Sequence, residues 1–103
     1  MLVNLGISIQ LPKNLGGFVL PRSGLATKHL ISPINSPGLI DPGYIGELMV
    51  PLMNYSDISY TVRRHERIAQ LVAIATNDLI FDEVDSLDLS DRSDGGFGST
   101  GKN

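Results

Sequence analysis

The sequence predicts a small all-β domain of the barrel or sandwich class. Short runs in which apolar and polar residues alternate recur along the chain, and clusters of proline and glycine separate them. This pattern is typical of strands joined by tight turns, and helix signals are almost absent. At 103 residues the chain is expected to form one domain. A domain of that size leaves much of its surface unburied, so association of several copies would add core.

The first two strands are expected near the start of the chain. From Val3 to Leu11, apolar side chains at every second position alternate with polar or small ones, which is the period of a half-buried strand. A shorter strand is expected from Phe18 to Leu20, because two glycines lead into it and Pro21 stops it.

Two turn clusters divide the middle of the chain around a brief strand at residues 39–40. In the second cluster, Pro42 and Gly43 suit the central positions of a type II turn, because proline presets the first φ angle and glycine accepts a positive second one. The segment from Leu39 to Val50 is therefore expected to be a hairpin. Pro51 in its return strand predicts an edge strand or a bulge.

The remaining strands are expected after residue 57. Alternation returns from Ile58 to Val62, an apolar run extends from Ile68 to Ala75, and a last short strand is expected from Leu79 to Val84. An acidic stretch then leads into a glycine-rich end. The expected organisation is a β domain over residues 1–90 and a flexible tail over residues 91–103.

Composition excludes several classes of function. The formal net charge is −3, with 11 acidic and 8 basic residues, which argues against a general binder of nucleic-acid polymers or membrane surfaces. Without cysteine, neither a disulfide framework nor a thiolate metal site can form, and the 2 histidines lack a zinc-ligand pattern. No apolar run approaches the roughly 20 residues of a membrane span, and the first residues lack the order of a signal peptide. We expect a cytoplasmic protein.

Three segments before the tail carry more polar groups than folding requires. In the first, Arg22, Ser23 and Gly24 directly follow a strand, and the guanidinium, the hydroxyl and backbone N–H groups could hold a phosphate. A helix that starts at Ser23 is the alternative interpretation. In the segment from Arg63 to Leu71, Gln70 lies within an apolar run, so its amide either satisfies backbone groups or faces a site.

The turn from Gly38 to Gly46 is the other polar segment. The mouth of a hairpin exposes main-chain donors and acceptors, which could read the hydrogen-bonding edge of a pyrimidine. Asp41 and Tyr44 would project near that mouth. Both also have ordinary structural interpretations, because aspartate often caps such turns and tyrosine often packs at a strand end.

The tail from Asp91 to Gly101 cannot pack a core, because its glycines leave the backbone loose and Phe97 is its single large apolar side chain. It is either a solvated end or a clamp for a nucleotide. In the second interpretation Arg92, Ser99 and Thr100 bind phosphate while Phe97 stacks on a planar ring.

These segments, in this order, resemble four of the five signature motifs of the trimeric dUTP pyrophosphatase (dUTPase) family. Each motif alone is weak, but four in register across most of the chain are highly specific. The four are PRSGLA at residues 21–26, GLIDPGYIG at 38–46, ERIAQL at 66–71 and RSDGGFGSTG at 92–101. Two departures are that Glu66 stands where an aspartate is usual, and that Arg92-Ser93-Asp94 replaces a more common arginine–glycine start.

The resemblance implies a jelly-roll-like β subunit of the β-clip type, assembled as a homotrimer with active sites at subunit interfaces. It also implies hydrolysis of dUTP to dUMP and pyrophosphate with Mg²⁺. This reaction removes dUTP from the nucleotide pool and supplies dUMP. Asp41 would bond the 3′-hydroxyl and orient or deprotonate the attacking water. Tyr44 would pack on the deoxyribose and leave no room for a 2′-hydroxyl.

The resemblance divides the other site residues into two groups. Those expected at uracil and the sugar are Asn35, Gly38, Leu39, Ile40 and Phe97. Those expected at the phosphates are Arg22, Ser23 and Gly24 from a neighbouring subunit, together with Gln70, Arg92, Gly98, Ser99 and Thr100.

The family's first motif, with an aspartate that helps to hold the hydrated Mg²⁺, has no counterpart in this chain. No metal ligand can therefore be assigned, and we expect slower hydrolysis with weak Mg²⁺ dependence. Two other functions stay open. One is a truncated, non-catalytic dUTPase-like protein that binds nucleotide or regulates a partner. The other is a dCTP deaminase-like enzyme, which shares the fold and a similar Pro-Gly turn but would lack the glycine-rich tail.

Overall fold

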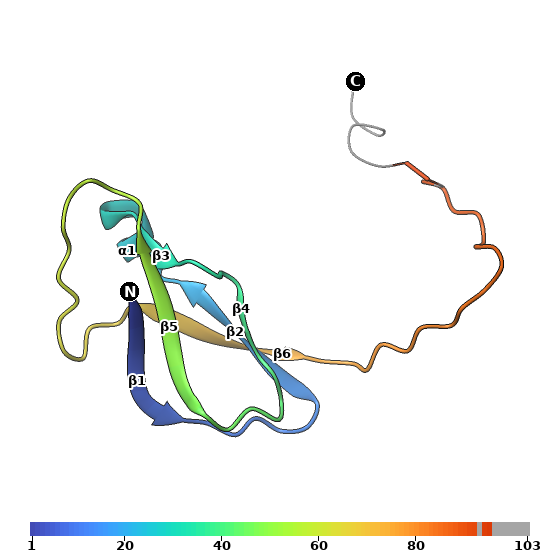
Figure 1. Cartoon of the computed structure of the whole chain (residues 1–103), viewed down its shortest axis with the longest axis horizontal. Coiled ribbons are helices and arrows are strands. Elements are labelled where there is room, and N and C mark those ends of the chain that lie inside the picture. Colours follow the sequence, from blue (N-terminus) through green and yellow to red (C-terminus); the bar gives the residue numbers. More distant parts are fainter. Residues whose placement is uncertain (93, 96–103) are drawn as a thin grey trace.

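The chain folds into two antiparallel sheets with one short helix in the computed structural model, which describes residues 1–92 and 94–95 (Figure 1). The elements are β1 (Leu2–Ser8), β2 (Leu15–Pro21), α1 (Ser23–His29), β3 (Ile31–Pro33), β4 (Gly38–Ile40), β5 (Glu47–Asn54) and β6 (Ala69–Ala75). The predicted all-β class is confirmed. No helix in the described part of the chain is long and apolar enough to cross a membrane.

Each sheet has three strands. The first has the order β1-β5-β3 and the second the order β4-β2-β6. In the second sheet, β2 pairs with β6 along its whole length, from Leu15 opposite Ala75 to Pro21 opposite Ala69. The strand predicted at residues 18–20 is therefore longer than its apolar residues indicated, because its glycines also join the ladder.

The core lies where the first sheet meets α1 and the start of β6. Side chains alternate along β5, so that Leu48, Val50 and Leu52 point inward, and Val50 is only 1% exposed. The buried cluster is Leu25, Ile31, Val50, Leu52 and Ile68. β5 thus supplies the centre of the core as well as the middle strand of its sheet.

A helix does begin at Ser23, as the alternative interpretation of this segment predicted. α1 starts at Ser23, buries Leu25 and ends at His29, and the following residue, Leu30, caps it with a left-handed φ of 55°. Ser23 does not cap the helix with its side chain; its carbonyl accepts a hydrogen bond from the Thr27 hydroxyl at 2.7 Å. Burial of Leu25 against the sheet stabilises a helix too short to persist alone.

The hairpin predicted from Leu39 to Val50 is wrong. β4 pairs with β2, with Leu39 opposite Phe18, whereas β5 pairs with β1 and β3. The turn itself is present, because the Tyr44 N–H donates to the Asp41 carbonyl at 3.1 Å. Gly43 does not have a positive φ, so the turn is not type II. The turn carries the chain from one sheet to the other instead of folding it back on its own strand.

Pro51 lies neither in an edge strand nor at a bulge, the two alternatives that the sequence predicted, and the bulge is on the partner strand β1. β5 is the middle strand, Pro51 stands opposite Leu2, and its carbonyl accepts the Ile34 N–H at 2.8 Å. The irregularity is in β1 between Asn4 and Ser8. β1 also ends at Ser8 rather than Leu11. The missing N–H of the proline is tolerated because Pro51 lies beyond the end of the pairing with β3, whose last pair is Pro33 and Leu52.

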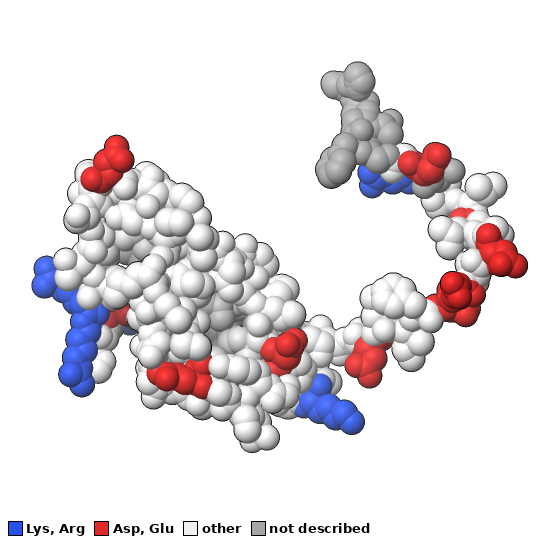
Figure 2. Space-filling model, in the orientation of Figure 1, with Lys and Arg blue, Asp and Glu red and all other residues white. Residues whose placement is uncertain are grey.

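Two expected strands do not form within the described residues, at positions 58–62 and 79–84. After β6 the chain leaves the body as an extended arm, defined here as residues 76–92 (Figure 1). Its apolar side chains have little to pack on: Ile80 is 88% exposed and Phe81 87%. Figure 2 shows acidic side chains spaced along this arm. The alternating pattern alone could not make strands there, because the single chain offers no neighbouring ladder.

Candidate functional site

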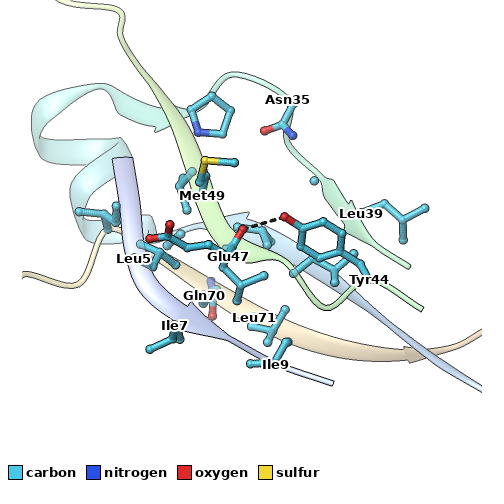
Figure 3. Close-up of a pocket in the computed structure, with 18 of the residues that line it drawn as sticks. Leu5, Ile7, Ile9, Asn35, Leu39, Tyr44, Glu47, Met49, Gln70 and Leu71 are labelled. Atoms are coloured by element: carbon cyan, nitrogen blue, oxygen red, sulfur yellow. Dashed lines mark hydrogen bonds between the residues drawn. The ribbon is translucent and has the colours of Figure 1, made fainter. Parts of the chain in front are cut away.

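A pocket of about 480 Å³ opens between the two sheets and the turn that links them (Figure 3). Its walls come from β1, β4, β5 and β6. Seven of the predicted site residues line it, and these are Asn35, Gly38, Leu39, Ile40, Asp41, Tyr44 and Gln70. Much of the remaining lining is apolar and includes Leu5, Ile7, Ile9, Met49 and Leu71. The structure thus joins the turn segment and Gln70, which are far apart in the sequence.

Tyr44 is held in one orientation by its own loop. Its hydroxyl donates to the Glu47 carbonyl at 2.8 Å, the dashed line in Figure 3. Its ring lies directly on Gly46, where an added Cβ would stand 2.6 Å from the hydroxyl oxygen. A side chain at position 46 would therefore displace the ring. Asp41, at the start of the same turn, has an exposed side chain in the pocket wall.

The amide of Asn35 lies over the start of β4. A Cβ added at Gly38 would stand 3.1 Å from Asn35 Nδ2, so the glycine leaves room for this amide. β4 is an edge strand, paired with β2 on one side. Its other edge leaves main-chain donors and acceptors outside the ladder, beside the Asn35 amide and within the pocket lining.

Gln70 takes both roles that the sequence allowed. Its Nε2 donates to the Pro21 carbonyl at 2.9 Å, which ties β6 to the end of β2, and the residue also lines the pocket. Arg22 follows directly, with Nη1 3.5 Å from the Arg67 carbonyl. Arg22, Ser23 and Gly24 are absent from the described lining of the pocket. The first polar segment therefore adds no residue to the lining, although Arg22 contacts Arg67, which does line the pocket.

Glu66 accepts hydrogen bonds from two other residues, and it was not selected as a site residue from the sequence. One carboxylate oxygen accepts the Arg63 N–H at 2.9 Å, and the other accepts a hydrogen bond from the Tyr60 hydroxyl. The bond from the Arg63 backbone, and then that from Tyr60, lower the pKa of Glu66. The same bond to Glu66 raises the pKa of Tyr60. The ring of His29 packs on Tyr60, with centroids 4.6 Å apart.

Glu47 is a second acidic residue that sequence reasoning did not select. Its Oε2 accepts the Gly6 N–H at 2.9 Å, across to β1, and it lines the pocket. The one signal in the sequence was a carboxylate at the first position of a strand, directly after a glycine. Its partner is set by the tertiary fold.

The described residues contain no group of three or more histidine, aspartate or glutamate side chains that could hold a metal ion. The acidic residues that line the pocket are Asp41, Glu47 and Glu66. Mg²⁺ is usually bound by one or two carboxylates together with substrate phosphates and waters.

The tail falls mostly outside the described residues. Arg92, the last residue of the arm, is described, and its Nε donates to the Gly95 carbonyl at 2.7 Å. Phe97, Gly98, Ser99 and Thr100 lie outside the described part of the chain.

Comparisons with known proteins agree with the fold. The family model for dUTPase matches residues 1–101. The chain is 49% identical over 96 residues to deoxyuridine 5′-triphosphate nucleotidohydrolase of Gloeobacter violaceus, covering 93% of this chain and 65% of the relative. It is 45% identical over 100 residues to the protein of the same name from Clostridioides difficile, covering 97% and 70%. The chain thus spans about two thirds of the length of the curated relatives that it matches.

Among solved structures, the chain is similar to the dUTPase of Staphylococcus bacteriophage 80alpha with dUPNHPP. The TM-score is 0.72 at 23% identity, covering 98% of this chain and 80% of that one. A point mutant of the same phage protein gives a TM-score of 0.71 at 21% identity, covering 97% and 80%. This likeness confirms the jelly-roll-like β fold.

Proposed function

Because the chain belongs to the dUTPase family, we propose that it hydrolyses dUTP to dUMP and pyrophosphate. The family model covers nearly the whole chain, and the curated relatives carry the name of that activity. The observation that carries the proposal is the pocket, which gathers Asp41, Tyr44 and the edge of β4.

In this proposal the open edge of β4 recognises uracil. The main-chain groups of Gly38, Leu39 and Ile40 that do not pair with β2, together with the Asn35 amide, offer fixed donors and acceptors to the hydrogen-bonding edge of the base. Backbone groups in a strand cost little to orient, because the sheet has already ordered them. The edge strand replaces the hairpin mouth expected from the sequence.

Tyr44 acts as the gate for the sugar. Its hydroxyl is already bonded to the Glu47 carbonyl and its ring rests on Gly46, so the ring cannot easily swing away from a bulkier sugar. A deoxyribose fits against the ring, whereas a 2′-hydroxyl meets it. Discrimination against UTP then rests on the rigidity of this one side chain.

Asp41 is the proposed base. Its carboxylate accepts a proton from a water molecule whose oxygen attacks the α-phosphorus. The bond between the α-phosphorus and the bridging oxygen to the β-phosphorus breaks, pyrophosphate leaves with that oxygen, and the water oxygen stays on dUMP. Asp41 is exposed in the pocket wall, which leaves room for the water and the sugar.

The phosphate groups are the part that a single chain does not complete. Arg22, Ser23 and Gly24 lie outside the described pocket lining, so a neighbouring copy is the proposed source of these three residues. Gln70 stands at the junction, because it lines the pocket and is bonded to the residue before Arg22. Arg92 with Phe97, Gly98, Ser99 and Thr100 is proposed to close over the base and phosphates.

The exposed arm supports assembly into a homotrimer with active sites between subunits. Three large apolar side chains at its start, Leu79, Ile80 and Phe81, are each at least 77% exposed in the single chain. Burying one such side chain stabilises an assembly by about 1.5–3 kcal/mol. Mg²⁺ would be brought by the triphosphate and would neutralise part of its charge, and no residue of the described chain is assigned as its ligand. The proposed location of the protein is the cytoplasm.

The decisive experiment incubates the purified chain with dUTP, dCTP or UTP in the presence of Mg²⁺ and identifies the products. We expect dUMP and pyrophosphate from dUTP, and little product from UTP or dCTP. Deamination of dCTP would support the deaminase alternative. Tight nucleotide binding without any product would support a non-catalytic protein, and either result would refute the proposal.

A further inference from the structure

β1 changes its pairing with β5 beside the pocket. Asn4 stands opposite Met49 and Ser8 opposite Glu47, so the residues between them on β1 outnumber those on β5. This bulge is centred on Gly6, whose φ is +74°. A Cβ at Gly6 would meet nothing within 4 Å, so the glycine is required by its backbone angle and not by lack of space.

The bulge presents two apolar side chains to the pocket. Leu5 and Ile7 flank Gly6, both line the pocket, and they are 39% and 54% exposed. A bulge re-aims side chains, but it also removes backbone groups from the ladder. The Gly6 N–H is one such group, and it donates to Glu47 Oε2 at 2.9 Å.

Glu47 therefore holds two walls of the pocket. Its side chain is bonded to the bulge of β1, and its main-chain carbonyl accepts the Tyr44 hydroxyl at 2.8 Å. Figure 3 shows Glu47 extending from the Tyr44 ring toward β1. Glu47 is the first residue of β5, at the point where the pairing with β1 is irregular. Glu47 pairs with Ser8 at the edge of the irregular stretch, and its side-chain bond to Gly6 adds a second link to β1.

We propose that Glu47 is a positioning residue for sugar discrimination, which couples the β1 bulge to the orientation of the Tyr44 ring. This inference rests on the proposed function for its effect on nucleotides. It assigns no role in the chemical step to Glu47 itself. Without the carboxylate, the Gly6 N–H loses its acceptor, the first residue of β5 shifts, and the Tyr44 hydroxyl loses a fixed partner.

The test compares Glu47→Ala with Glu47→Gln in the full chain. Glutamine keeps an oxygen that accepts the Gly6 N–H, so it should behave like the original residue. In Glu47→Ala we expect hydrogen exchange at the Gly6 amide, measured by NMR, to accelerate by about five- to tenfold. We also expect the ratio of kcat/KM for dUTP to that for UTP to fall by about tenfold, chiefly because UTP is better accepted. Asp57→Ala, an exposed acidic residue away from the pocket, serves as the control.

Gly6→Ala tests the same coupling between the β1 bulge and the Tyr44 ring by changing the bulge instead of Glu47. A Cβ strains the left-handed backbone, so this variant should lower the dUTP preference with Glu47 intact. The double variant should lose no more selectivity than the stronger single variant, because the two residues act as one unit. Urea unfolding checks that each variant remains folded.

Two results would overturn the inference independently. One is Gly6 exchange in Glu47→Ala equal to that of the original chain. The other is unchanged selectivity in Glu47→Ala when the original chain hydrolyses dUTP. An original chain that leaves dUTP intact would refute the proposed function, and the Gly6 exchange would still decide whether the Glu47 bond exists.

Discussion

β5 and the arm both carry apolar side chains at intervals, but only β5 buries some of them in the core. In β5, every second side chain is buried, and Leu48, Val50 and Leu52 are all no more than 8% exposed. In the arm, Leu87 and Leu89 are 86% and 91% exposed. β5 has hydrogen-bonded strands on both sides, whereas the arm has none among the described residues. Alternating apolar residues make a strand only where a neighbouring strand supplies the ladder, and the described chain supplies none to the arm.

The largest expected effect tests whether the chemistry belongs to the body rather than to the arm. Asp41→Asn should lower dUTP turnover by about two to four orders of magnitude, because the amide cannot accept the proton from water. The turn should survive, since asparagine also suits its first position. Single-turnover kinetics and calorimetry with a non-hydrolysable dUTP analogue separate chemistry from binding. Normal turnover would remove Asp41 from its assigned role.

The next effect compares matched truncations in the two regions. Val50→Ala should lower the free energy of unfolding by about 2 kcal/mol at any protein concentration, because it opens a cavity in the core. Leu87→Ala should cost less than about 0.5 kcal/mol in dilute solution, where the arm is unpacked. Urea unfolding at several protein concentrations measures both.

The concentration dependence makes that comparison sharper. If the arm packs on other copies, the unfolding midpoint of the original chain should rise with protein concentration, and Leu87→Ala should reduce this rise. A midpoint that is independent of concentration would argue against assembly through the arm.

A smaller effect is expected from the end of the arm. Deletion of residues 92–103 should lower kcat/KM for dUTP by about tenfold, because the proposed closure over the phosphates is lost. The melting temperature should stay the same, since Arg92 bonds only to Gly95 among the contacts described for it. A sharp drop in melting temperature would show that these residues contribute to the folded body.

The smallest effect is the pH dependence contributed by Glu66. Its pKa lies below the usual 4.5, because the Arg63 N–H and the Tyr60 hydroxyl favour the charged carboxylate. A lowered pKa gives a stability contribution that is complete above the unfolded pKa and is lost as pH falls through the folded one. Urea unfolding between about pH 3 and pH 7 should therefore show a steeper acid loss for the original chain than for Glu66→Gln. Parallel curves would contradict this role.

The sequence predicted the apolar strands well but not their partners. β5 was visible as a strand because one of its faces is buried. β6 was visible as a run of apolar residues, although its side chains are half-buried or exposed in the single chain. The turn chemistry of Pro42 and Gly43 indicated a reversal, yet it could not say which strand would receive the chain. The helix from Ser23 depended on Leu25 reaching the core, which propensity alone does not decide.

The residues of the site likewise divide into those that the sequence predicted and those that it did not. Asp41, Tyr44, Asn35 and Gln70 were selected from motifs, and the fold brings all four to one pocket. Glu47 and Glu66 were not selected, because their partners Gly6 and Tyr60 are set by tertiary packing. Motifs identify the groups that a substrate could meet, but not the residues that hold those groups in place.

The hydrogen bond between Tyr60 and Glu66 also has an optical consequence. The chain contains 3 tyrosines and no tryptophan, so its ultraviolet emission comes from phenol rings alone. An excited phenol readily passes its proton to a bonded carboxylate, which should leave Tyr60 dim. Tyr55 is 62% exposed in a loop, and Tyr44 stands in the pocket wall. A nucleotide stacked near Tyr44 would quench that ring over the steady signal of Tyr55, so the folded chain carries its own fluorescent reporter of occupancy.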